Sequence, residues 1–514
     1  MLTLASSTPT IVVMRQSMGP KPGLRVRMLF LLLCALALAP PLPSQPTTPP
    51  SPPGIETYSL QNGLSVALLP QEHSGALKIA LAYDAGISAH TKNTAGLFKT
   101  LELILFRGPA VSPGEPEPAG ALAALAPLEI KGGAETNGFS LSLLLDPSML
   151  REGLDTMAYL FSHLRIQSAL ADPAALAYAK ESVLGIINHG LSDPFSIYDA
   201  ALSKKLFASS PWRFDEAGAD YIVRPATVET LESLATAWLV PNNAILAVVG
   251  NFDPVLARQW IETAFSSWKK APDPWKSQSY PLLPKPGVPR PTLLVYPDPS
   301  VIEGEAAIEM RYRGPDAASP RAPALELLSA MASKPQSRLA KALSSGLPTW
   351  ATPRNIGFLY RQSKATSWFS VSATISTSPK GNLPEAVLAF KETVRGSEMY
   401  AMKVNPNYFS PGEYESAKQE LTQEWQNALA DPASGTDRIV QSWLRGGFPY
   451  LGTWESRIKA LGTKDLAALA DEFFMKNLEI VAVRVSPSEF AQRERSFKSY
   501  GFEVIGAATA FWWR

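Results

Sequence analysis

Strand-like and helix-like patterns follow one another along the chain without a regular alternation. Residues 64–70, 78–85 and 139–145 are apolar or alternate between apolar and polar side chains, which predicts strands. Long helical patterns come next, and a further apolar strand at 244–250 precedes a helix that begins at Asp253-Pro254. This order predicts an α+β fold, with an antiparallel-rich sheet and helices packed on one of its faces.

The same order of elements occurs twice in the chain. The sequence LSDPFS at 191–196 recurs as LADPAS at 429–434, which is 238 residues later. Three further matches come in a consistent order, namely 78–86 with 307–315, 227–231 with 463–466, and 243–249 with 477–483. Four ordered matches at nearly constant spacing are hard to obtain by chance, so we expect two homologous α/β units of about 220 residues each.

Prolines divide the chain into segments. Of the 46 prolines, eight lie within residues 40–53, and a second proline-rich stretch spans residues 272–291. Such segments are extended and have no core of their own, so we expect a tether and a linker. The predicted organisation is a signal peptide or N-terminal anchor at 1–39, a tether at 40–54, an N-terminal domain at 55–271, a linker at 272–291 and a C-terminal domain at 292–514.

The N-terminal segment has the pattern of an export signal. About twelve apolar residues at 28–39 follow Arg25 and Arg27, and this run is too short to span a bilayer comfortably. We therefore expect export to the periplasm or cell envelope, with a retained anchor as the alternative. Cys34 leaves lipidation open, although Leu33 stands where a lipoprotein signal requires a small residue. A membrane tether through the N-terminus follows from either alternative.

Composition narrows the classes of function. The 47 Lys and Arg residues balance 46 Asp and Glu residues, so the chain lacks the positive excess that a nucleic-acid partner requires. A single cysteine excludes internal disulfides and cysteine cages for metals. The sequence contains no G-x-S-x-G, P-loop or G-x-G-x-x-G motif. No motif therefore supports a serine hydrolase, an NTPase or a dinucleotide-binding enzyme.

The segment GLFKTLELILFRG at 96–108 resembles the zinc-site helix of the pitrilysin, insulinase and mitochondrial-processing-peptidase family of inverzincin metallopeptidases. The signature of that family is H-x-x-E-H on a helix. Residues 219–254 are similar to the family's turn, helix and strand, and Ser337-Arg338-Leu339 resembles its S-R-L at a helix start. The resemblance covers nearly all of residues 55–514 and implies a duplicated metallopeptidase-like fold. The motif context itself matches at Gly96, Leu97, Leu101, Glu102, Phe106 and Gly108.

Within this resemblance, the positions of the zinc ligands are occupied by other residues. Lys99 stands at the first histidine and Leu103 at the second, so that only Glu102 of the signature remains. The third ligand of the family is a glutamate at the end of an E-x-x-x-x-x-x-E pattern. Glu181 fits the first glutamate of this pattern, which puts the ligand position on Asn188.

These replacements predict a site without metal, cofactor or catalytic residue. Catalytic zinc needs about three protein ligands. His189 follows Asn188 but points about 100° away from it on a helix, so it is a poor substitute. Lys99 and Glu102 are three residues apart on one helix, where an exposed ion pair contributes roughly 0.2–0.5 kcal/mol. We therefore expect this pair to fill the empty site.

The second half also lacks the residues that active relatives use to hold substrate. Those relatives supply an arginine and a tyrosine in a pattern such as L-R-x-x-x-x-L-x-Y. Ser344 replaces the arginine, and Trp350 or Thr349 replaces the tyrosine. Residues 332–339 also lack the glycine-rich loop of the noncatalytic processing-peptidase subunit. The aromatic residues in the segment 507–514 are expected to dock on their own domain rather than on a partner.

The resemblance implies a probable pseudoenzyme, for which three functions are considered. Members of the family form a clamshell of four homologous units, from one long chain or two shorter ones. The first hypothesis is therefore an exported noncatalytic subunit that encloses peptide substrates together with an intact zinc-peptidase homologue, as a heterodimer. The second is a stand-alone peptide- or protein-binding scaffold. The least favoured is an active zinc peptidase with relocated ligands.

Overall fold

The computed structural model describes residues 52, 54–105, 117–134, 137–207, 210–277, 288 and 290–514. The predicted signal segment with Cys34 lies outside these residues, as do most of the tether, much of the linker, and Phe106 and Gly108. All the described residues belong to one unit by their contacts. No helix in this part of the chain combines the length and the apolar character that crossing a membrane requires.

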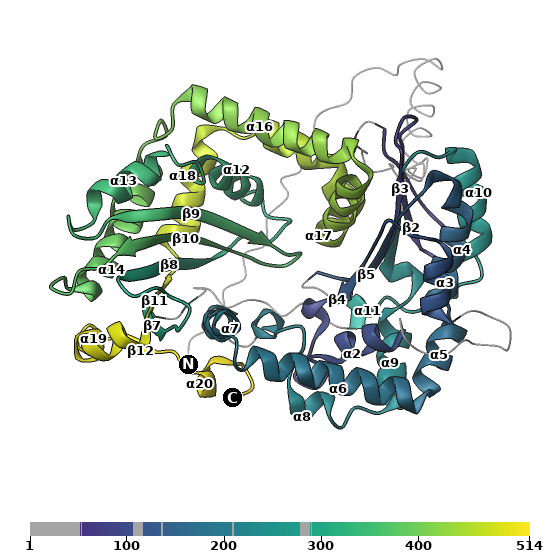
Figure 1. The fold of residues 1–514 in the computed structure, drawn as a ribbon. Coiled ribbons are helices and arrows are strands. Elements are labelled where there is room, and N and C mark those ends of the chain that lie inside the picture. Colours follow the sequence, from purple (N-terminus) through teal and green to yellow (C-terminus); the bar gives the residue numbers. More distant parts are fainter. Residues whose placement is uncertain are drawn as a thin grey trace, which may run out of the picture. The chain divides into compact units, whose positions relative to one another are not determined.

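The first half contains a six-stranded mixed sheet (Figure 1). Only β2 and β6 are parallel, and the other neighbouring strands are antiparallel. Every residue of β3 and β6 is buried, as expected for apolar strands that are covered on both faces. From edge to edge the strands are β1 (Glu56–Ser59), β2 (Ser65–Pro70), β6 (Ala244–Gly250), β3 (Leu77–Tyr83), β5 (Phe139–Leu145) and β4 (Glu129–Ala134).

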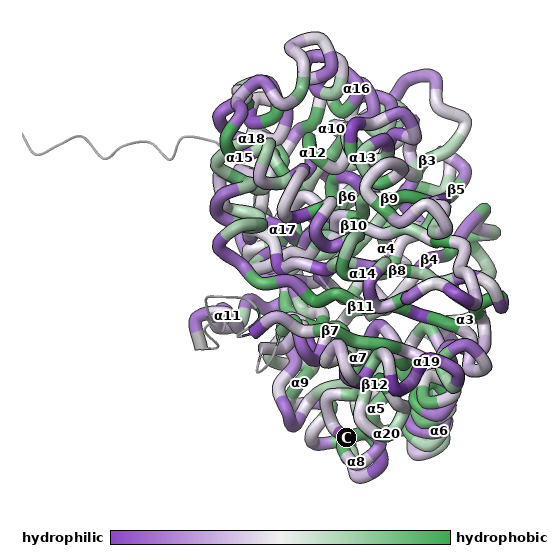
Figure 2. The backbone as a smooth tube through the Cα atoms, turned by 90° about the vertical axis from the view of Figure 1, so that its left-hand side faces the viewer, coloured by the Kyte–Doolittle hydropathy of each residue, from purple (hydrophilic) through white to green (hydrophobic). Residues whose placement is uncertain are grey.

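The second half repeats five of these strands in the same order, and β12 takes the edge place of β1 but pairs parallel rather than antiparallel with its neighbour. In Figure 2 the strands β7 and β11 are mostly green, because their residues are mostly hydrophobic. The predicted α+β fold of two homologous, antiparallel-rich units is therefore confirmed. From edge to edge the strands are β12 (Glu503–Val504), β7 (Thr292–Pro297), β11 (Ile480–Val485), β8 (Glu305–Gly314), β10 (Ser367–Ser376) and β9 (Pro353–Gln362).

The buried tyrosines of the two central strands occupy equivalent places. Tyr83 on β3 pairs with Phe139 on β5, and Tyr312 on β8 pairs with Phe369 on β10. Both tyrosines are fully buried, and their rings lie 6.3 and 5.1 Å from the rings of the paired phenylalanines. The repeat match that aligns these two tyrosines is therefore confirmed.

Asn243 and Asn477, which the repeat also aligns, make the same hydrogen bond in the two halves. The amide of Asn243 donates to the carbonyl of Asp84 at 3.2 Å, and that of Asn477 donates to the carbonyl of Arg313 at 3.5 Å. The sequence match places equivalent residues of β6 and β11 234 positions apart. In the structure, the residues of these strands that face the helices of their own half are 235 positions apart, so the predicted match is wrong by one residue beyond the asparagines. The connection from Asn477 to an equivalent residue of β11 is therefore one residue longer than that from Asn243 to β6. It contains Glu479, which is buried and forms ion pairs with Lys391 and Arg395.

The helices of each half pack on one face of its own sheet, as predicted. The first half has α2 (Leu97–Leu105), α3 (Pro118–Ala124), α4 (Leu150–Leu160), α5 (His163–Ala171), α6 (Pro173–Gly190), α8 (Asp220–Val223), α9 (Val228–Trp238) and α10 (Pro254–Phe265), with α11 (Pro274–Ser277) after them. The second half has α12 (Ala322–Ala332), α13 (Arg338–Gly346), α14 (Leu383–Lys391), α15 (Tyr400–Val404), α16 (Pro411–Ala430), α18 (Thr463–Leu469), α19 (Pro487–Ser499) and α20 (Ala507–Ala510). Two π-helical segments, η5 (Glu392–Met399) and η6 (Ala470–Met475), pack together in the second half.

Each half also sends one helix onto the free face of the other half's sheet, which the sequence did not predict. Helix α17 (Pro432–Lys459) packs on β3 and β6, and α7 (Pro194–Phe207) packs on β8 and β11. Both helices begin at the repeated Asp-Pro. Asp193 and Asp431 accept the backbone N–H groups of Ser196 and Ser434, each at 2.8 Å. Helix α17 is twice as long, with 28 residues against 14, and it bends at Gly446–Gly447.

Candidate functional site

The start of α2, the helix that carries the degenerate motif, is held by two glycines. Gly96 and Gly218 have φ values of 91° and 71°, a region that favours glycine. A Cβ on Gly96 would lie 2.2 Å from the carbonyl oxygen of Ala217, and a Cβ on Gly218 would lie 2.2 Å from that of Ala95. The two backbones therefore touch, and the place of the helix is tightly fixed.

Lys99 and Glu102 form an ion pair that also joins α2 to β4. The Lys99 ammonium donates to both oxygens of the Glu102 carboxylate, at 3.0 and 2.9 Å. The backbone N–H of Ala134 donates to Oε2 of Glu102 at 2.8 Å. The two side chains are only 20% and 8% exposed. The pair is therefore largely buried, because the carboxylate accepts the backbone N–H at the end of β4.

Leu103, at the position of the family's second histidine, belongs to an apolar cluster. Its side chain packs against the buried residues Val183, Leu184 and Ile187 of α6. Trp513 packs against the same cluster. The surface between α2 and α6 that would hold a metal in a zinc peptidase is therefore apolar at this point.

Asn188 lies on a different side of α6 from the apolar cluster. It lies on the exposed side of α6, as do Glu181 and His189. The side of α6 that faces Leu103 is instead formed by the residues of the apolar cluster, including the preceding Ile187. The structure thus brings Lys99 together with Glu102, but leaves Asn188 in solvent.

These residues do not fit a zinc ion. Lys99 brings a positive charge, Leu103 has no donor atom and Asn188 faces away, whereas zinc sites use histidine, cysteine or carboxylate donors. No three His, Cys, Asp or Glu residues of the described chain gather into a possible metal site. His90 lies next to α2, but it stacks on Phe98 at 5.6 Å, and burial lowers its pKa to about 3. No motif in the sequence singles out this histidine.

Ser344 and Trp350 lie in the second half, with partners of their own. The hydroxyl of Ser344 donates to the carbonyl of Ala340 within α13, at 2.8 Å. The ring of Trp350 covers Gly381, where a Cβ would lie 2.8 Å from it. Both residues therefore have local structural contacts.

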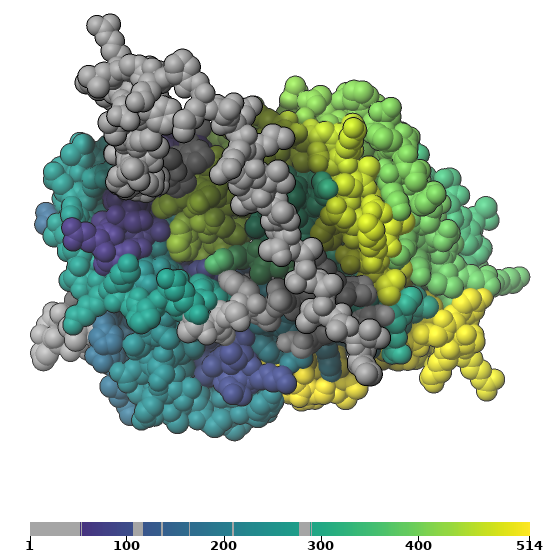
Figure 3. All heavy atoms as spheres, turned by 180° about the vertical axis from the view of Figure 1, so that it is seen from behind, coloured from purple at the N-terminus to yellow at the C-terminus, as the bar shows by residue number. Residues whose placement is uncertain are grey.

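The aromatic residues after α20 dock on the first half, so the expectation that they pack on their own domain is wrong. Trp512 lies 4.4 Å from the ring of Phe214, and Phe511 is buried beside α7. Lys204 of α7 donates to the carbonyl of Phe511 at 2.9 Å. In Figure 3 the yellow atoms of this segment lie against teal atoms of the first half. The segment ties the two halves together.

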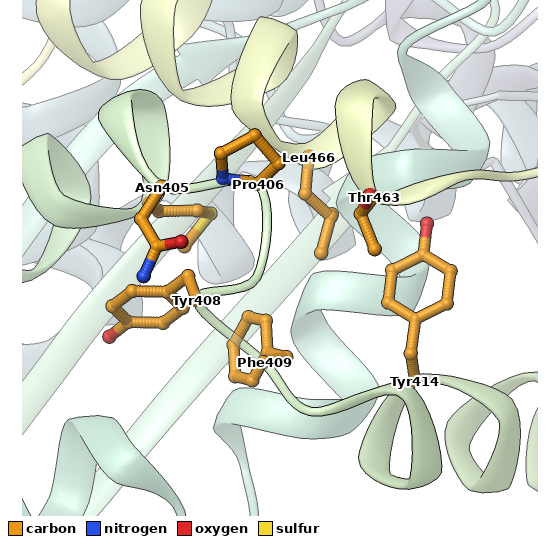
Figure 4. A pocket seen from close by; sticks show the side chains of 8 residues that line it. Asn405, Pro406, Tyr408, Phe409, Tyr414, Thr463 and Leu466 are labelled. Carbon is orange, nitrogen blue, oxygen red and sulfur yellow. The ribbon is translucent and has the colours of Figure 1, made fainter.

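Two hollows lie away from α2. The smaller, in the second half, has a volume of about 10 Å³, which is enough for one water molecule (Figure 4). It is lined by Met402, Asn405, Pro406, Tyr408, Phe409, Tyr414, Thr463 and Leu466. The larger, of about 590 Å³, is a groove between α9 and residues 271–274 that includes Glu229, Glu232, Asp273 and Trp238. Neither contains a residue that the sequence singled out.

Comparisons with known proteins agree with this fold. Residues 225–425 match the family model described as peptidase M16 inactive domain. No curated protein sequence matches the chain. A peptidase M16 inactive domain from Pseudomonas fluorescens is similar at a TM-score of 0.66 and 16% identity, over 84% of this chain and 98% of that one.

Two further solved structures are similar over most of their length. A chain of complex III2 from Candida albicans, solved with Inz-5 bound, has a TM-score of 0.66 at 15% identity, covering 88% of this chain and 100% of that one. The first half of the periplasmic protease PqqL from Escherichia coli has a TM-score of 0.62 at 16% identity, covering 88% and 97%. The family-model match and the Pseudomonas fluorescens structure, both described as inactive peptidase domains, favour a noncatalytic, peptidase-like protein. The predicted resemblance to the pitrilysin, insulinase and processing-peptidase family is thereby confirmed for the fold and for the family-model match over residues 225–425.

Proposed function

We propose that this chain is an exported noncatalytic subunit that encloses peptides together with an intact zinc-peptidase homologue. The observation that carries the proposal is the packing of Leu103 into the apolar cluster of α6, beside the closed pair of Lys99 and Glu102. In the resemblance, these positions belong to the zinc ligands and the general base. An apolar side chain and a neutralised carboxylate cannot activate water. Hydrolysis would therefore belong to the partner.

Peptide contact is assigned to the open edge of β4. Among the described strands β4 pairs only with β5, so its other side presents unpaired backbone groups. Leu128 and Ile130 are 68% and 47% exposed at this edge, and the exposed Gly132 leaves the backbone accessible, whereas Gly133 is buried. An extended peptide can add to such an edge through backbone hydrogen bonds.

The partner and the location rest on the neighbours and on the sequence. One neighbour is half of a periplasmic protease and another is a chain of a multi-subunit complex. A two-unit chain fits half of a four-unit chamber, and the apolar run at 28–39 fits export. The domain limits at 55–271 and 292–514 are part of the same proposal.

Co-purification tests the partnership. The chain is expressed alone and with intact H-x-x-E-H relatives, and cleavage of an extended peptide is measured for each preparation. We expect cleavage only when an intact relative co-purifies with this chain. Peptide binding by the chain alone, with no relative retained, would instead support the scaffold hypothesis and overturn the partnership.

A pair of exposed substitutions tests the role of β4. Ile130→Ser removes an exposed apolar side chain from the edge strand, and Val404→Ser removes one that is 55% exposed on α15. We expect Ile130→Ser to weaken peptide binding several-fold and Val404→Ser to leave it unchanged. Equal binding by both variants would remove β4 from the proposal.

Metal analysis tests the absence of a zinc site. The triple variant Lys99→His, Leu103→His and Asn188→Glu restores the family's ligand types. We expect it to gain no stoichiometric zinc, because residue 188 faces solvent while Leu103 faces the apolar cluster. Stoichiometric zinc in the unaltered chain, with chelator-sensitive hydrolysis, contradicts the proposal outright.

A further inference from the structure

A group of polar residues joins the two halves where β9 ends and α17 bends. The hydroxyl of Tyr450 donates to Oε1 of Gln362 at 3.0 Å. The amide of Asn137, in the first half, donates to the backbone carbonyl of Gln362 at 3.4 Å. Arg445 precedes Tyr450 by five residues on α17, and its positive charge acts on the Tyr450 hydroxyl. These four residues, Asn137, Gln362, Arg445 and Tyr450, are called the junction cluster below.

The junction cluster lies in a region with more positive than negative charge. Arg438, Arg445 and Arg457 of α17 all act on the carboxylate of Glu326 in α12. The indole of Trp454 donates to this carboxylate at 3.0 Å, and burial raises the pKa of Glu326. Three arginines thus share one carboxylate. Arg438 and Arg445 have no salt bridge to a carboxylate within the described chain.

Two hydrogen-bond donors of the junction cluster have no acceptor among the described residues. They are Nε of Arg445 and Nε2 of Gln362, and both atoms are buried. A buried donor without an acceptor is costly, and it points to a ligand or solvent that completes the site. Both side chains are only partly buried as a whole, so a ligand can reach them.

We propose that the junction cluster binds an oxyanion, with a carboxylate as the ligand group. The guanidinium of Arg445 supplies charge and directed donors, and the amide of Gln362 supplies a second donor. A neutral water could accept these hydrogen bonds, but it would leave the charge uncompensated. A carboxylate satisfies both requirements.

The carboxylate could come from a peptide or from a free acid. Asn137 follows Ala134, the last residue of β4, by three positions. A peptide added to the edge of β4 could therefore present its C-terminal or side-chain carboxylate to the cluster. This source rests on the proposed function, whereas binding of a free anion does not.

The test uses the full chain and three probes. They are sodium sulfate, a ten-residue peptide with a free C-terminus and no acidic side chains, and the same peptide amidated. Binding is measured by calorimetry at constant ionic strength. The variant is Arg445→Gln, and the matched control is Arg361→Gln, an exposed arginine on the opposite side of β9 from Gln362.

We expect sulfate to bind the unaltered chain and Arg361→Gln equally, and to bind Arg445→Gln at least tenfold more weakly. A tenfold preference for the free-acid peptide over its amide, lost in Arg445→Gln, assigns the site to peptide carboxylates. Sulfate binding without that preference assigns it to free anions. Equal binding of sulfate by all three proteins, or none by the unaltered chain, overturns the site whatever the outcome of the partnership test. Circular dichroism of Arg445→Gln, together with a milder Gln362→Met variant, separates lost binding from lost folding.

Discussion

Helices α7 and α17 begin at the same repeated sequence, yet they bury different charges against the opposite sheets. Asp199 of α7 pairs with Arg311 of β8 at 2.7 Å, and Asp437 of α17 pairs with Lys78 of β3 at 2.7 Å. The two aspartates are 238 residues apart, as the repeat requires. The duplication thus kept the acidic partner on each crossing helix.

The cations do not occupy equivalent places. With Tyr83 aligned to Tyr312, Lys78 lies five residues before its tyrosine and Arg311 lies one residue before its own. Arg311 also binds Glu309 at 2.8 Å and stacks on a tryptophan ring, whereas Lys78 has only Asp437 and one carbonyl. A cation at different positions along a strand can therefore form the ion pair that holds the crossing helix on the sheet. The second sheet has the larger number of interactions around its cation.

Removing the cation of each ion pair is expected to give the largest difference in stability between the two halves. Arg311→Met leaves Glu309 and Asp199 without a buried cation, and we expect it to lower the free energy of unfolding by about 3 kcal/mol. Lys78→Met leaves only Asp437, whose side chain is 53% exposed, so we expect a loss below about 1 kcal/mol. Urea unfolding of both variants checks this, and equal losses contradict the comparison.

The bend of α17 provides the next test, because α7 ends where α17 bends. Gly447 has φ 68° and ψ −167°, a conformation that is nearly restricted to glycine. We expect Gly447→Ala to cost about 1–2 kcal/mol of unfolding free energy. Gly412→Ala in α16 serves as the control, because nothing lies within 4 Å of the added Cβ. A null result for both would mean that the bend is not set by Gly447.

A pH effect is expected from Asp215 in the first half. Burial raises the pKa of Asp215 from 3.8 to about 6, against the effect of its hydrogen bond from Gly218. The folded state then holds this proton more tightly than the unfolded state, so Asp215 lowers stability as pH rises from about 4 to 6. We expect Asp215→Asn to remove a decrease in the free energy of unfolding of about 2 kcal/mol between pH 4.5 and pH 7. Unfolding curves at pH 4.5 and pH 7 measure the difference, and parallel pH profiles contradict it.

The smallest effects are expected at the equivalent tyrosines. The hydroxyls of Tyr83 and Tyr312 are buried and accept or donate no hydrogen bond among the described residues. Removing an unpartnered hydroxyl releases its desolvation cost, so Tyr83→Phe and Tyr312→Phe should be neutral or stabilising by less than about 1 kcal/mol. Tyr414→Phe is the control, because its hydroxyl donates to Gly462 at 2.7 Å, and it should destabilise the chain. Thermal unfolding ranks the three variants.

The fold was predictable because the same order of sequence patterns occurs in both halves of the chain. Matches around Tyr83 and Tyr312, or Asn243 and Asn477, fix the same strand order in both halves. The crossing of α7 and α17 was not predictable, because their amphipathic patterns show a buried face but not which sheet covers it. The one-residue offset beyond Asn477 was missed for a similar reason, since apolar strands match equally well in neighbouring registers.

The site was predictable only in part. The spacing of Lys99 and Glu102 on one helix predicts their ion pair, which the structure contains. Burial of the pair depends on Ala134, which lies in another strand, so helix spacing alone suggested an exposed pair. The direction of Asn188 depends on the rotation of α6, which a pattern of glutamates could not fix. The junction cluster combines residues from distant segments and had no sequence signal.

The exchange of helices has a consequence for synthesis on the ribosome. The outer face of the first sheet, with Ala80 and Ala247, is covered by α17, which begins at Pro432. A nascent chain that has just completed β6 must therefore wait for more than 180 further residues before that apolar face is shielded. Until then that face stays open to solvent, so maturation of the two halves is coupled in time as well as in space.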